Sequence, residues 1–296
     1  MPVILGVNHQ FLYPESIVNE EAHTATLRAL SQSAHIQALD CWVWRGQQRA
    51  AEEASILRSC GKVINYNAGN RFGEERVFPT AADKKQRTRA YDHYMREISL
   101  ALDVGAKKIV LASGPDTPHG REAAKERLYE FLLKLMSQLP AGVSLSLEAT
   151  DRDVDKRYLL GPLAETVAFI KKLHADGLHQ IGLLLDMGHI PLLHETLASA
   201  INASRGVLNH IHLGNAVVKN KSDPLYGDKH VPWGYPGSEY TEQDGASFVR
   251  MLREIGYTDG ENATVSFEMR PYAGLSADES LRRFVAVFER GMAAEQ

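Results

Sequence analysis

The chain has 296 residues, of which 44% are hydrophobic and 24% are charged. These fractions are typical of a globular protein with a large core, and they argue against intrinsic disorder. The formal net charge is -4, from 33 basic and 37 acidic residues. The chain therefore has no general attraction to a polyanion, and we do not expect a nucleic-acid partner.

Short apolar runs alternate with segments of helical periodicity along the whole chain. In chain order, the expected strands are PVILGVN, HIQALD, KVINYN, KKIVLAS, VSLSLEA, IGLLLDM, LNHIHLG and ATVSFEM. Apolar stripes at i, i+3, i+4 and i+7 mark the helices around 128–135, 248–255 and 281–288. Repeated βα units without a linker predict an α/β fold, a single (β/α)8 TIM barrel that spans residues 1–296 as one domain.

Three connections are longer than a minimal turn, namely 68–84, 150–160 and 217–240. Each follows a strand, and in a barrel the loops after the strands build the active-site face. The third contains KNKSDPLYGDKHVPWGYPG, whose Pro, Gly and aromatic residues favour a structured loop over a flexible tether. We call residues 217–240 the flap and expect it to be an active-site loop.

The cysteines and the N-terminal segment bear on the setting of the protein. Cys41 and Cys60 form neither a CxxC redox pair nor a thiolate zinc finger, which favours a reduced, cytoplasmic compartment. The segment MPVILGVNHQ lacks a basic stretch followed by a long apolar one, and no run of about 18 apolar residues occurs. We expect a soluble protein with no membrane partner.

Four of the predicted strands end in side chains that commonly bind metals, namely Glu148, Asp186, His212 and Glu268. The C-terminal ends of parallel barrel strands converge on one mouth, so these side chains are expected to meet there. Singly, each could be an ordinary ion pair or an interior histidine. Jointly, three carboxylates in one mouth would repel each other unless they were protonated or neutralised by a cation. The pattern therefore predicts a divalent metal site and a metal enzyme.

Two further histidines lie close to these ligand positions in the sequence. His210 and His212 are two residues apart on one strand and face the same side, so we place His210 in a deeper polar layer. His189 follows Asp186 in the turn after the sixth strand. It could approach the metal or a substrate, or simply make a loop contact.

These residues, with the motif DMGH at 186–189, resemble the signature of the xylose isomerase-like superfamily, in particular the D-tagatose and D-psicose 3-epimerase group. The resemblance implies one divalent cation, Mn²⁺ in first place with Co²⁺, Mg²⁺ or Zn²⁺ as alternatives, bound to two oxygens of a keto sugar. It also implies that Glu148 and Glu268 act as the acid/base pair through a metal-bound enediolate. His189 would then hydrogen-bond a substrate oxygen.

The chain departs from the 3-epimerase pattern after the seventh strand. Where those enzymes have an arginine that grips the substrate, this chain reads NAVVKNK and offers only Lys219 or Lys221. The flap that follows contains Asp228 and His230, a DxH pattern similar to endonuclease IV, an apurinic-site nuclease of the same superfamily that uses three zinc ions. Together with His189, these two residues could form a second metal site. Alternatively, His230 could contact the sugar or act as a base.

Other residues are candidates for substrate contact. His9 leaves the first strand and Arg270 follows the last one. Trp233 in the flap would suit a larger glycoside, although such an aromatic residue could simply pack the loop. With Lys219, these residues form the predicted substrate-binding set.

The leading prediction is a metal-dependent isomerase or epimerase acting on a small keto sugar or 3-oxo sugar. The first alternative is the catalytic subunit of a C-glycoside deglycosidase, a lyase of the same superfamily that acts on 3-oxo-glycosides and works with a smaller second subunit. The second is an endonuclease IV-like nuclease, although NYNAG and LASGP at the ends of strands three and four lack its histidines. A non-catalytic scaffold that retains the cation is the last. Resemblance also implies a homo-oligomer.

Overall fold

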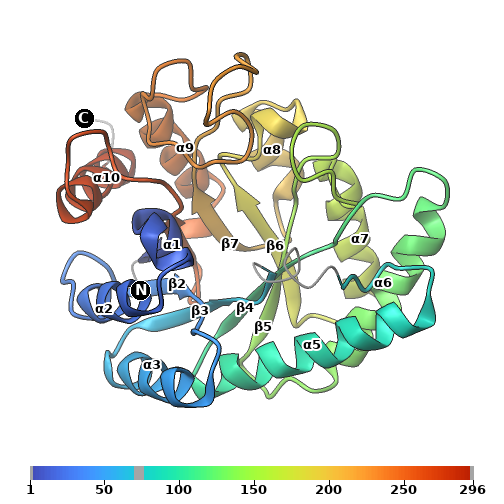
Figure 1. Cartoon of the computed structure of the whole chain (residues 1–296). Coiled ribbons are helices and arrows are strands. Elements are labelled where there is room, and N and C mark those ends of the chain that lie inside the picture. Colours follow the sequence, from blue (N-terminus) through green and yellow to red (C-terminus); the bar gives the residue numbers. More distant parts are fainter. Residues whose placement is uncertain (1–2, 70–76, 294–296) are drawn as a thin grey trace.

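The computed structural model describes residues 3–69 and 77–293. Eight parallel strands pair in sequence order and close into a barrel, with the helices outside it (Figure 1). The strands are β1 (Ile4–Asn8), β2 (Ala38–Cys41), β3 (Val63–Asn67), β4 (Lys108–Ala112), β5 (Ser144–Glu148), β6 (Ile181–Asp186), β7 (Leu208–Leu213) and β8 (Thr264–Phe267). The predicted TIM barrel is confirmed, and each strand falls within a predicted run or at its end.

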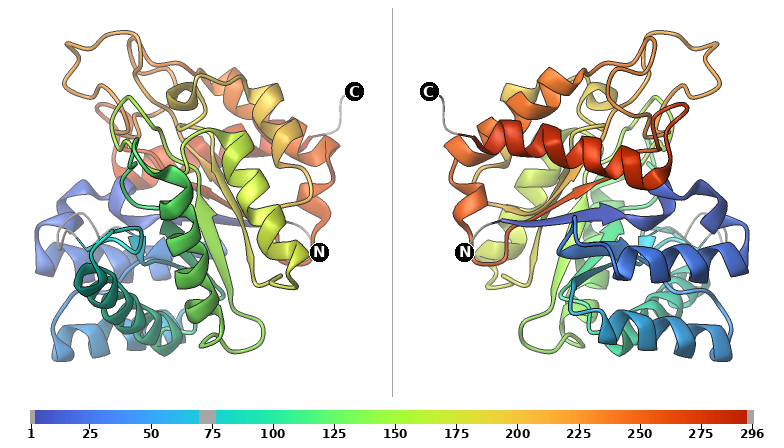
Figure 2. Two further views of the ribbon diagram at one scale, coloured as in Figure 1. Left: turned by 90° about the vertical axis from the view of Figure 1, so that its right-hand side faces the viewer. Right: turned by 90° about the vertical axis from the view of Figure 1, so that its left-hand side faces the viewer.

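The helices lie on the outside of the barrel, as the two side views show (Figure 2). The longer ones are α2 (Glu20–Ser31), α3 (Gln47–Ser59), α5 (Lys84–Asp103), α6 (Arg121–Met136), α7 (Leu163–Ala175), α8 (Leu197–Ser204), α9 (Glu242–Glu254) and α10 (Ala277–Met292). Shorter turns of helix are α1 (His9–Leu12), η1 (Pro14–Ile17), η3 (Pro191–Leu193) and η4 (Tyr257–Asp259). Within the described ranges, no helix has both the length and the apolar character needed to cross a membrane.

Local sequence explains where several of these helices begin. Thr196, Thr241 and Ser276 precede α8, α9 and α10, and each forms a reciprocal capping box with the residue three positions later. Such a box satisfies backbone N–H groups that the first helical turn leaves without partners. The capped helices follow the loops after β6, β7 and β8, so the ends of the flap and of its neighbours are fixed.

The long loops lie after strands, as predicted, and two of them meet. The loop 150–160 follows β5, and the flap follows β7 as the long orange loop beside α8 and α9 (Figure 1). The third loop, 68–84, lies partly outside the described residues, as do residues 1–2 and 294–296 of the predicted domain. Asn215, just before the flap, holds the far end of the flap against the barrel. Its side-chain amide donates to the carbonyl oxygens of Pro232 and Tyr240 at 3.2 and 2.9 Å.

Trp233 anchors the flap and does not serve the cavity. Its side chain is 1% exposed and its ring makes T-shaped contacts with Phe267 and Phe284, at centroid distances of 6.3 and 5.9 Å. Gly245 of α9 lets the ring approach, because a Cβ there would lie 2.7 Å from the indole. The predicted substrate contact is therefore replaced by a core contact, since burying so large an apolar ring stabilises the flap.

We expect Trp233→Ala to lower the free energy of unfolding by about 3–5 kcal/mol, because it leaves a cavity between β8, α9 and α10. Chemical denaturation followed by circular dichroism measures this change. Tyr235→Ala is the matched control, since Tyr235 is a half-buried flap aromatic whose hydroxyl donates to Asp223 at 3.3 Å. A loss below about 1 kcal/mol is expected there. Equal losses in the two variants would contradict the anchoring role.

Candidate metal centre and active site

The four predicted ligand side chains meet at the C-terminal mouth of the barrel. Glu148 and Asp186 are the last residues of β5 and β6, His212 lies near the end of β7, and Glu268 directly follows β8. The parallel register places Asp186 opposite His212 on the neighbouring strand. One ligand atom from each of the four side chains lies within 4.8 Å of the other three. This is a spacing at which one ion could be bound by all four.

The inner atoms of this group are buried without hydrogen bonds. Asp186 Oδ2, His212 Nδ1 and Glu268 Oε2 make no hydrogen bond to any described residue. His212 Nδ1 contacts Glu268 Oε2 and lies 3.9 Å from Asp186 Oδ2, whereas the Glu148 side chain is 17% exposed and faces the cavity. Buried polar atoms are nearly always paired, and leaving them unpaired is costly. Oxygen and nitrogen atoms that face one another in this way fit a divalent cation.

The outer oxygens of two carboxylates are fixed by hydrogen bonds. Asp186 Oδ1 accepts from the backbone N–H of Gly188 at 2.5 Å, and Glu268 Oε1 accepts from the side-chain amide of Asn8 at 2.7 Å. Each bond leaves the second oxygen directed at the common centre. Gly188 is required there because a Cβ would meet the backbone of Asn215 at 2.9 Å. The close approach of the Asn215 backbone thus explains why the DMGH motif has a glycine at this position.

Asp40, at the end of β2, orients the histidine ligand from below. Its Oδ2 accepts from Nε2 of both His212 and His210, at 2.7 and 2.6 Å, and its Oδ1 accepts from Asn65 and Ser266 at 2.6 and 2.9 Å. Burial raises the pKa of Asp40, but the two histidines outweigh it and hold that pKa well below its usual value. A carboxylate that fixes the far nitrogen of a ligand histidine is a common support for metal sites.

Sequence reasoning missed Asp40, although the signal was present. The run HIQALD ends in a carboxylate in the same way as the runs of β5 and β6. His210 lies in the deeper layer where it was expected, because its ring also reaches Thr264 Oγ1 at 2.6 Å. Burial lowers the pKa of His210 to about 4, despite the neighbouring Asp40. The ring is therefore neutral at neutral pH and is a structural support.

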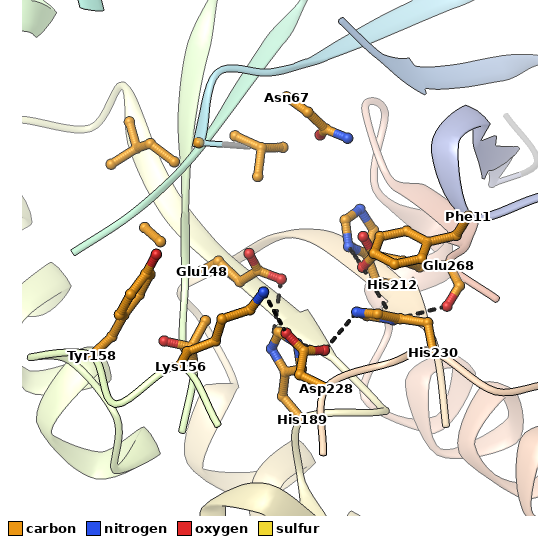
Figure 3. A pocket seen from close by; sticks show the side chains of 15 residues that line it. Phe11, Asn67, Glu148, Lys156, Tyr158, His189, His212, Asp228, His230 and Glu268 are labelled. Carbon is orange, nitrogen blue, oxygen red and sulfur yellow. Dashed lines mark hydrogen bonds and ion pairs between the residues drawn. The ribbon is translucent and has the colours of Figure 1, made fainter. Parts of the chain in front are cut away.

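A second cluster forms where the flap meets the mouth of the barrel (Figure 3). Asp228 Oδ1 lies 3.0 Å from His189 Nε2 and 2.6 Å from His230 Nε2, and Asp228 Oδ2 lies 3.2 Å from the Lys156 ammonium. Burial raises the pKa of Asp228, but Lys156 and the histidines outweigh it and hold it well below its usual value. The same carboxylate raises the pKa of Lys156. The structure thus brings together all three residues of the predicted second site.

Neighbouring carboxylates raise the pKa values of the two histidines in this cluster. Burial lowers the pKa of His189, but Asp228 and Asp186 outweigh it and raise that pKa well above its usual value. Asp228 and Glu268 likewise overcome burial and raise the pKa of His230 to about 9. His230 adopts a left-handed backbone conformation with φ of 52°, which is uncommon outside glycine. Strained residues of this kind cluster at functional sites.

Several residues that line the cavity above both clusters were not predicted from the sequence. Phe11, Asn67, Lys156 and Tyr158 line it together with the candidate ligands. Lys156 and Tyr158 belong to the loop 150–160, whose length was the available signal. The Phe11 ring packs at a tilt against the His230 ring, with a centroid distance of 4.0 Å, so α1 closes the side of the cavity next to the flap.

Two predicted substrate-binding residues lie away from this cavity. His9 is buried, and its Nε2 is 2.7 Å from Thr26 Oγ1, because the ring packs against α2 rather than into the mouth. Lys219 points outward with 77% of its side chain exposed and pairs with Glu239 at 2.9 Å. Neither side chain lines the cavity among the residues described.

Arg270, after β8, holds the flap backbone in position. Its Nε donates to the carbonyl oxygen of Lys229 at 2.9 Å, and its backbone N–H donates to the carbonyl oxygen of His230 at 2.8 Å. These bonds attach the flap segment that carries Asp228 and His230 to the segment after β8. The arginine therefore supports cavity residues instead of lining the cavity itself.

Comparisons with known proteins agree with this architecture. The family model described as xylose isomerase-like TIM barrel matches residues 46–286. Among curated protein sequences, none matches the chain. Solved structures of the same fold show the range of proteins that share it.

Three of these structures carry informative names. D-psicose 3-epimerase from Clostridium cellulolyticum H10, solved with D-tagatose, is 14% identical with a TM-score of 0.66, covering 98% of this chain and 97% of that chain. The 3-keto-D-glucoside 4-epimerase of E. coli is 16% identical with a TM-score of 0.67, covering 96% and 98%. AP endonuclease, family 2, from Brucella melitensis is 18% identical with a TM-score of 0.69, covering 97% and 99%.

At these identities the structural likeness concerns the fold alone, whereas the family model extends over most of the sequence. The resemblance inferred from the strand-end residues and the DMGH motif is confirmed at this level. The chain belongs to the xylose isomerase-like TIM barrel family.

Proposed function

We propose that this protein is a divalent-metal-dependent isomerase or epimerase that acts on a keto sugar or a 3-oxo sugar through an enediolate. One observation carries the proposal: four strand-end donors converge beside a cavity, and three of their inner atoms are buried without a hydrogen bond to any described residue. A cation would satisfy all three atoms, and the cavity leaves Glu148 and Glu268 accessible to a small molecule.

Glu148, Asp186, His212 and Glu268 would hold the ion. Three carboxylates and one imidazole form a hard donor set, which suits Mn²⁺ and Mg²⁺ and also admits Co²⁺ or Zn²⁺. We propose Mn²⁺ as the ion used. When bound, it would polarise the substrate carbonyl and so acidify the neighbouring C–H bond. The residues themselves then need only to move protons and to hold the sugar.

In this proposal Glu148 and Glu268 move those protons. Both carboxylates line the cavity (Figure 3), and His212 Nδ1 contacts that of Glu268. In this proposal one carboxylate removes the proton from the carbon beside the ketone, which leaves an enediolate. The other carboxylic acid returns a proton to the opposite face, which inverts that carbon. No redox partner or co-substrate is needed for this sequence.

The histidines of the flap side would bind the sugar. His189 Nδ1 lies 3.6 Å from Glu148 Oε1, and His230 Nδ1 lies 4.0 Å from Glu268 Oε2, so each ring accompanies one of the two carboxylates. Both rings line the cavity and are held through Nε2 by Asp228. Their Nδ1 atoms lie 3.1 and 3.0 Å from the carbonyl oxygens of Ala149 and Glu268, so a hydrogen bond to a substrate oxygen would replace one of these contacts. To serve as a base, His230 would first have to lose its proton, because its pKa is raised to about 9.

The names of two similar structures support the same chemistry. The name 3-keto-D-glucoside 4-epimerase places the inverted carbon beside a ketone, and D-psicose 3-epimerase is also a sugar epimerase. A 3-oxo-glycoside could instead lose its aglycone after the same proton abstraction, which is the lyase alternative. The likeness to an AP endonuclease keeps phosphodiester cleavage as a third outcome of the test.

The decisive experiment is proton exchange in D₂O with Mn²⁺-loaded protein and a panel of ketoses and 3-oxo-glucosides. We expect deuterium on the carbon beside the ketone, with appearance of the epimer or isomer. Glu148→Gln and Glu268→Gln should each lower the rate by about 10²- to 10⁴-fold, because Gln keeps the shape but cannot exchange the proton. Glu289→Gln, at an exposed position of α10, is the control and should be unaffected.

Other results of this experiment separate the alternatives. Unchanged exchange in both cavity variants would show that the acid/base assignment is wrong. Release of a free aglycone would select the lyase. Cleavage of an abasic duplex without exchange into any sugar would select the nuclease.

The support that Asp40 gives to His212 predicts a specific loss of metal affinity. Asp40→Asn keeps the size of the side chain but replaces a fixed acceptor of two imidazole N–H groups. We expect the Kd for Mn²⁺ to rise by about 10- to 100-fold, measured by titration calorimetry on metal-free protein. Asp92→Asn, on the exposed face of α5, is the control. An unchanged Kd for Asp40→Asn would exclude this supporting role.

The affinity for the metal ion should increase with pH. Burial, together with Glu268, raises the pKa of Asp186 to about 7, and Glu268 and Asp40 overcome burial to raise that of His212. Both groups must lose a proton before they bind an ion, so affinity increases as the pH rises through 7. Below pH 7 we expect the affinity to fall at least about tenfold per pH unit. A Kd for Mn²⁺ that stays constant from pH 5 to pH 8 would contradict this.

A further inference from the structure

The cluster around Asp228 has the ligand chemistry of a second metal site. His189 Nε2 and His230 Nε2 lie 3.0 and 2.6 Å from Asp228 Oδ1, and all three side chains are buried. Asp186 Oδ2 lies 3.9 Å from His189 Nε2 and 3.8 Å from His230 Nδ1, so the cluster borders directly on the four-residue centre. Two imidazoles and a carboxylate are common ligands of zinc and manganese.

The Lys156 ammonium already supplies a positive charge to this cluster. Its Nζ lies 3.2 Å from Asp228 Oδ2, and the Asp228 side chain is only 4% exposed. Figure 3 shows the lysine side chain extended toward the Asp228 carboxylate. The ammonium therefore neutralises the carboxylate that a second ion would need. A second divalent ion at Asp228 would have to displace this charge or tolerate its repulsion.

The loop 150–160 is built to hold Lys156 in this place. The Asp151 carboxylate accepts from the backbone N–H groups of Val154, Asp155 and Lys156, each at 2.7 Å. Arg157, the next residue, has a left-handed backbone with φ of 56°. Three converging N–H groups on one carboxylate fix the turn locally, so the direction of the lysine does not depend on its ion pair alone.

The flap meets this turn through a second, independent ion pair. Lys229 Nζ and the Asp228 backbone N–H both reach Asp155 Oδ2, at 3.0 and 2.9 Å. The loop and the flap are thus joined at adjacent positions, and only the Lys156 pair faces the cavity. Lys229 therefore provides a matched control: it is the same residue type, in an ion pair between the same two segments, but outside the cavity lining.

We propose that the Lys156 ammonium supplies at Asp228 Oδ2 the positive charge that a second metal ion would otherwise bring, and that the centre therefore binds one divalent ion per chain. This inference rests on the proposed single-ion centre at Glu148, Asp186, His212 and Glu268. It also deepens the proposed function. A fixed ammonium beside one ion suits proton transfer on a neutral sugar, whereas two-metal clamps stabilise both oxygens of a phosphoryl displacement.

The test counts ions. Metal-free protein is dialysed to equilibrium against excess Mn²⁺, and bound metal per chain is measured by mass spectrometry for wild type, Lys156→Met, Lys156→Arg and Lys229→Met. Met keeps the length of lysine and removes its charge, whereas Arg keeps the charge. We expect one ion in wild type, Lys156→Arg and Lys229→Met, and a doubling to two ions in Lys156→Met. Adding Asp228→Asn to Lys156→Met should return the count to one.

The outcomes separate this inference from the proposed function. Two ions in wild type, or one ion in Lys156→Met, would overturn the role of Lys156. No ion in folded wild-type protein would instead overturn the four-residue metal centre and the function that depends on it. If Lys156→Met does not fold, as judged by circular dichroism, Lys156→Gln carries the same expectation of two ions. A second ion in Lys229→Met would also count against the assignment.

Discussion

Repulsion between carboxylates is the constraint on which the site depends. A closed parallel barrel directs the ends of its strands to one mouth, and this chain places Glu148, Asp186 and Glu268 there. Such a group is stable only if opposite charge is supplied or protons are retained. The raised pKa of Asp186, about 7 as a result of burial and of Glu268, expresses that conflict. A divalent ion would remove it, and the same ion would supply the electrophile for sugar chemistry.

The second constraint is orientation, and the fold meets it from several directions. Hydrogen bonds from Asn8 and Gly188 fix the outer carboxylate oxygens, and Asp40 fixes the far nitrogen of His212. Each supporting group comes from a strand end or a strand-to-helix turn, so it is held by the barrel itself. Rigid support of this kind keeps ligand atoms at a common centre, which is what affinity for a small cation requires.

The flap adds charged and polar side chains to the cavity beside this centre. Trp233 packs into the core and Arg270 bonds to the flap backbone, so Asp228 and His230 are held over the mouth. Lys156 approaches the same carboxylate from the loop 150–160. Charge is thus balanced twice, by a proposed ion at the strand ends and by a lysine at the flap.

The sequence by itself determined the barrel, its eight strands, the long loops and the four strand-end donors. It could do so because strand ends share one mouth and because the period of each segment is local information. Only the tertiary structure decided that Trp233 and His9 pack into the interior, that Lys219 faces outward, and that Asp40 and Lys156 complete the site. The direction of a loop side chain depends on which distant residues it meets, such as Phe284 for Trp233 or Asp228 for Lys156. No periodicity encodes such contacts.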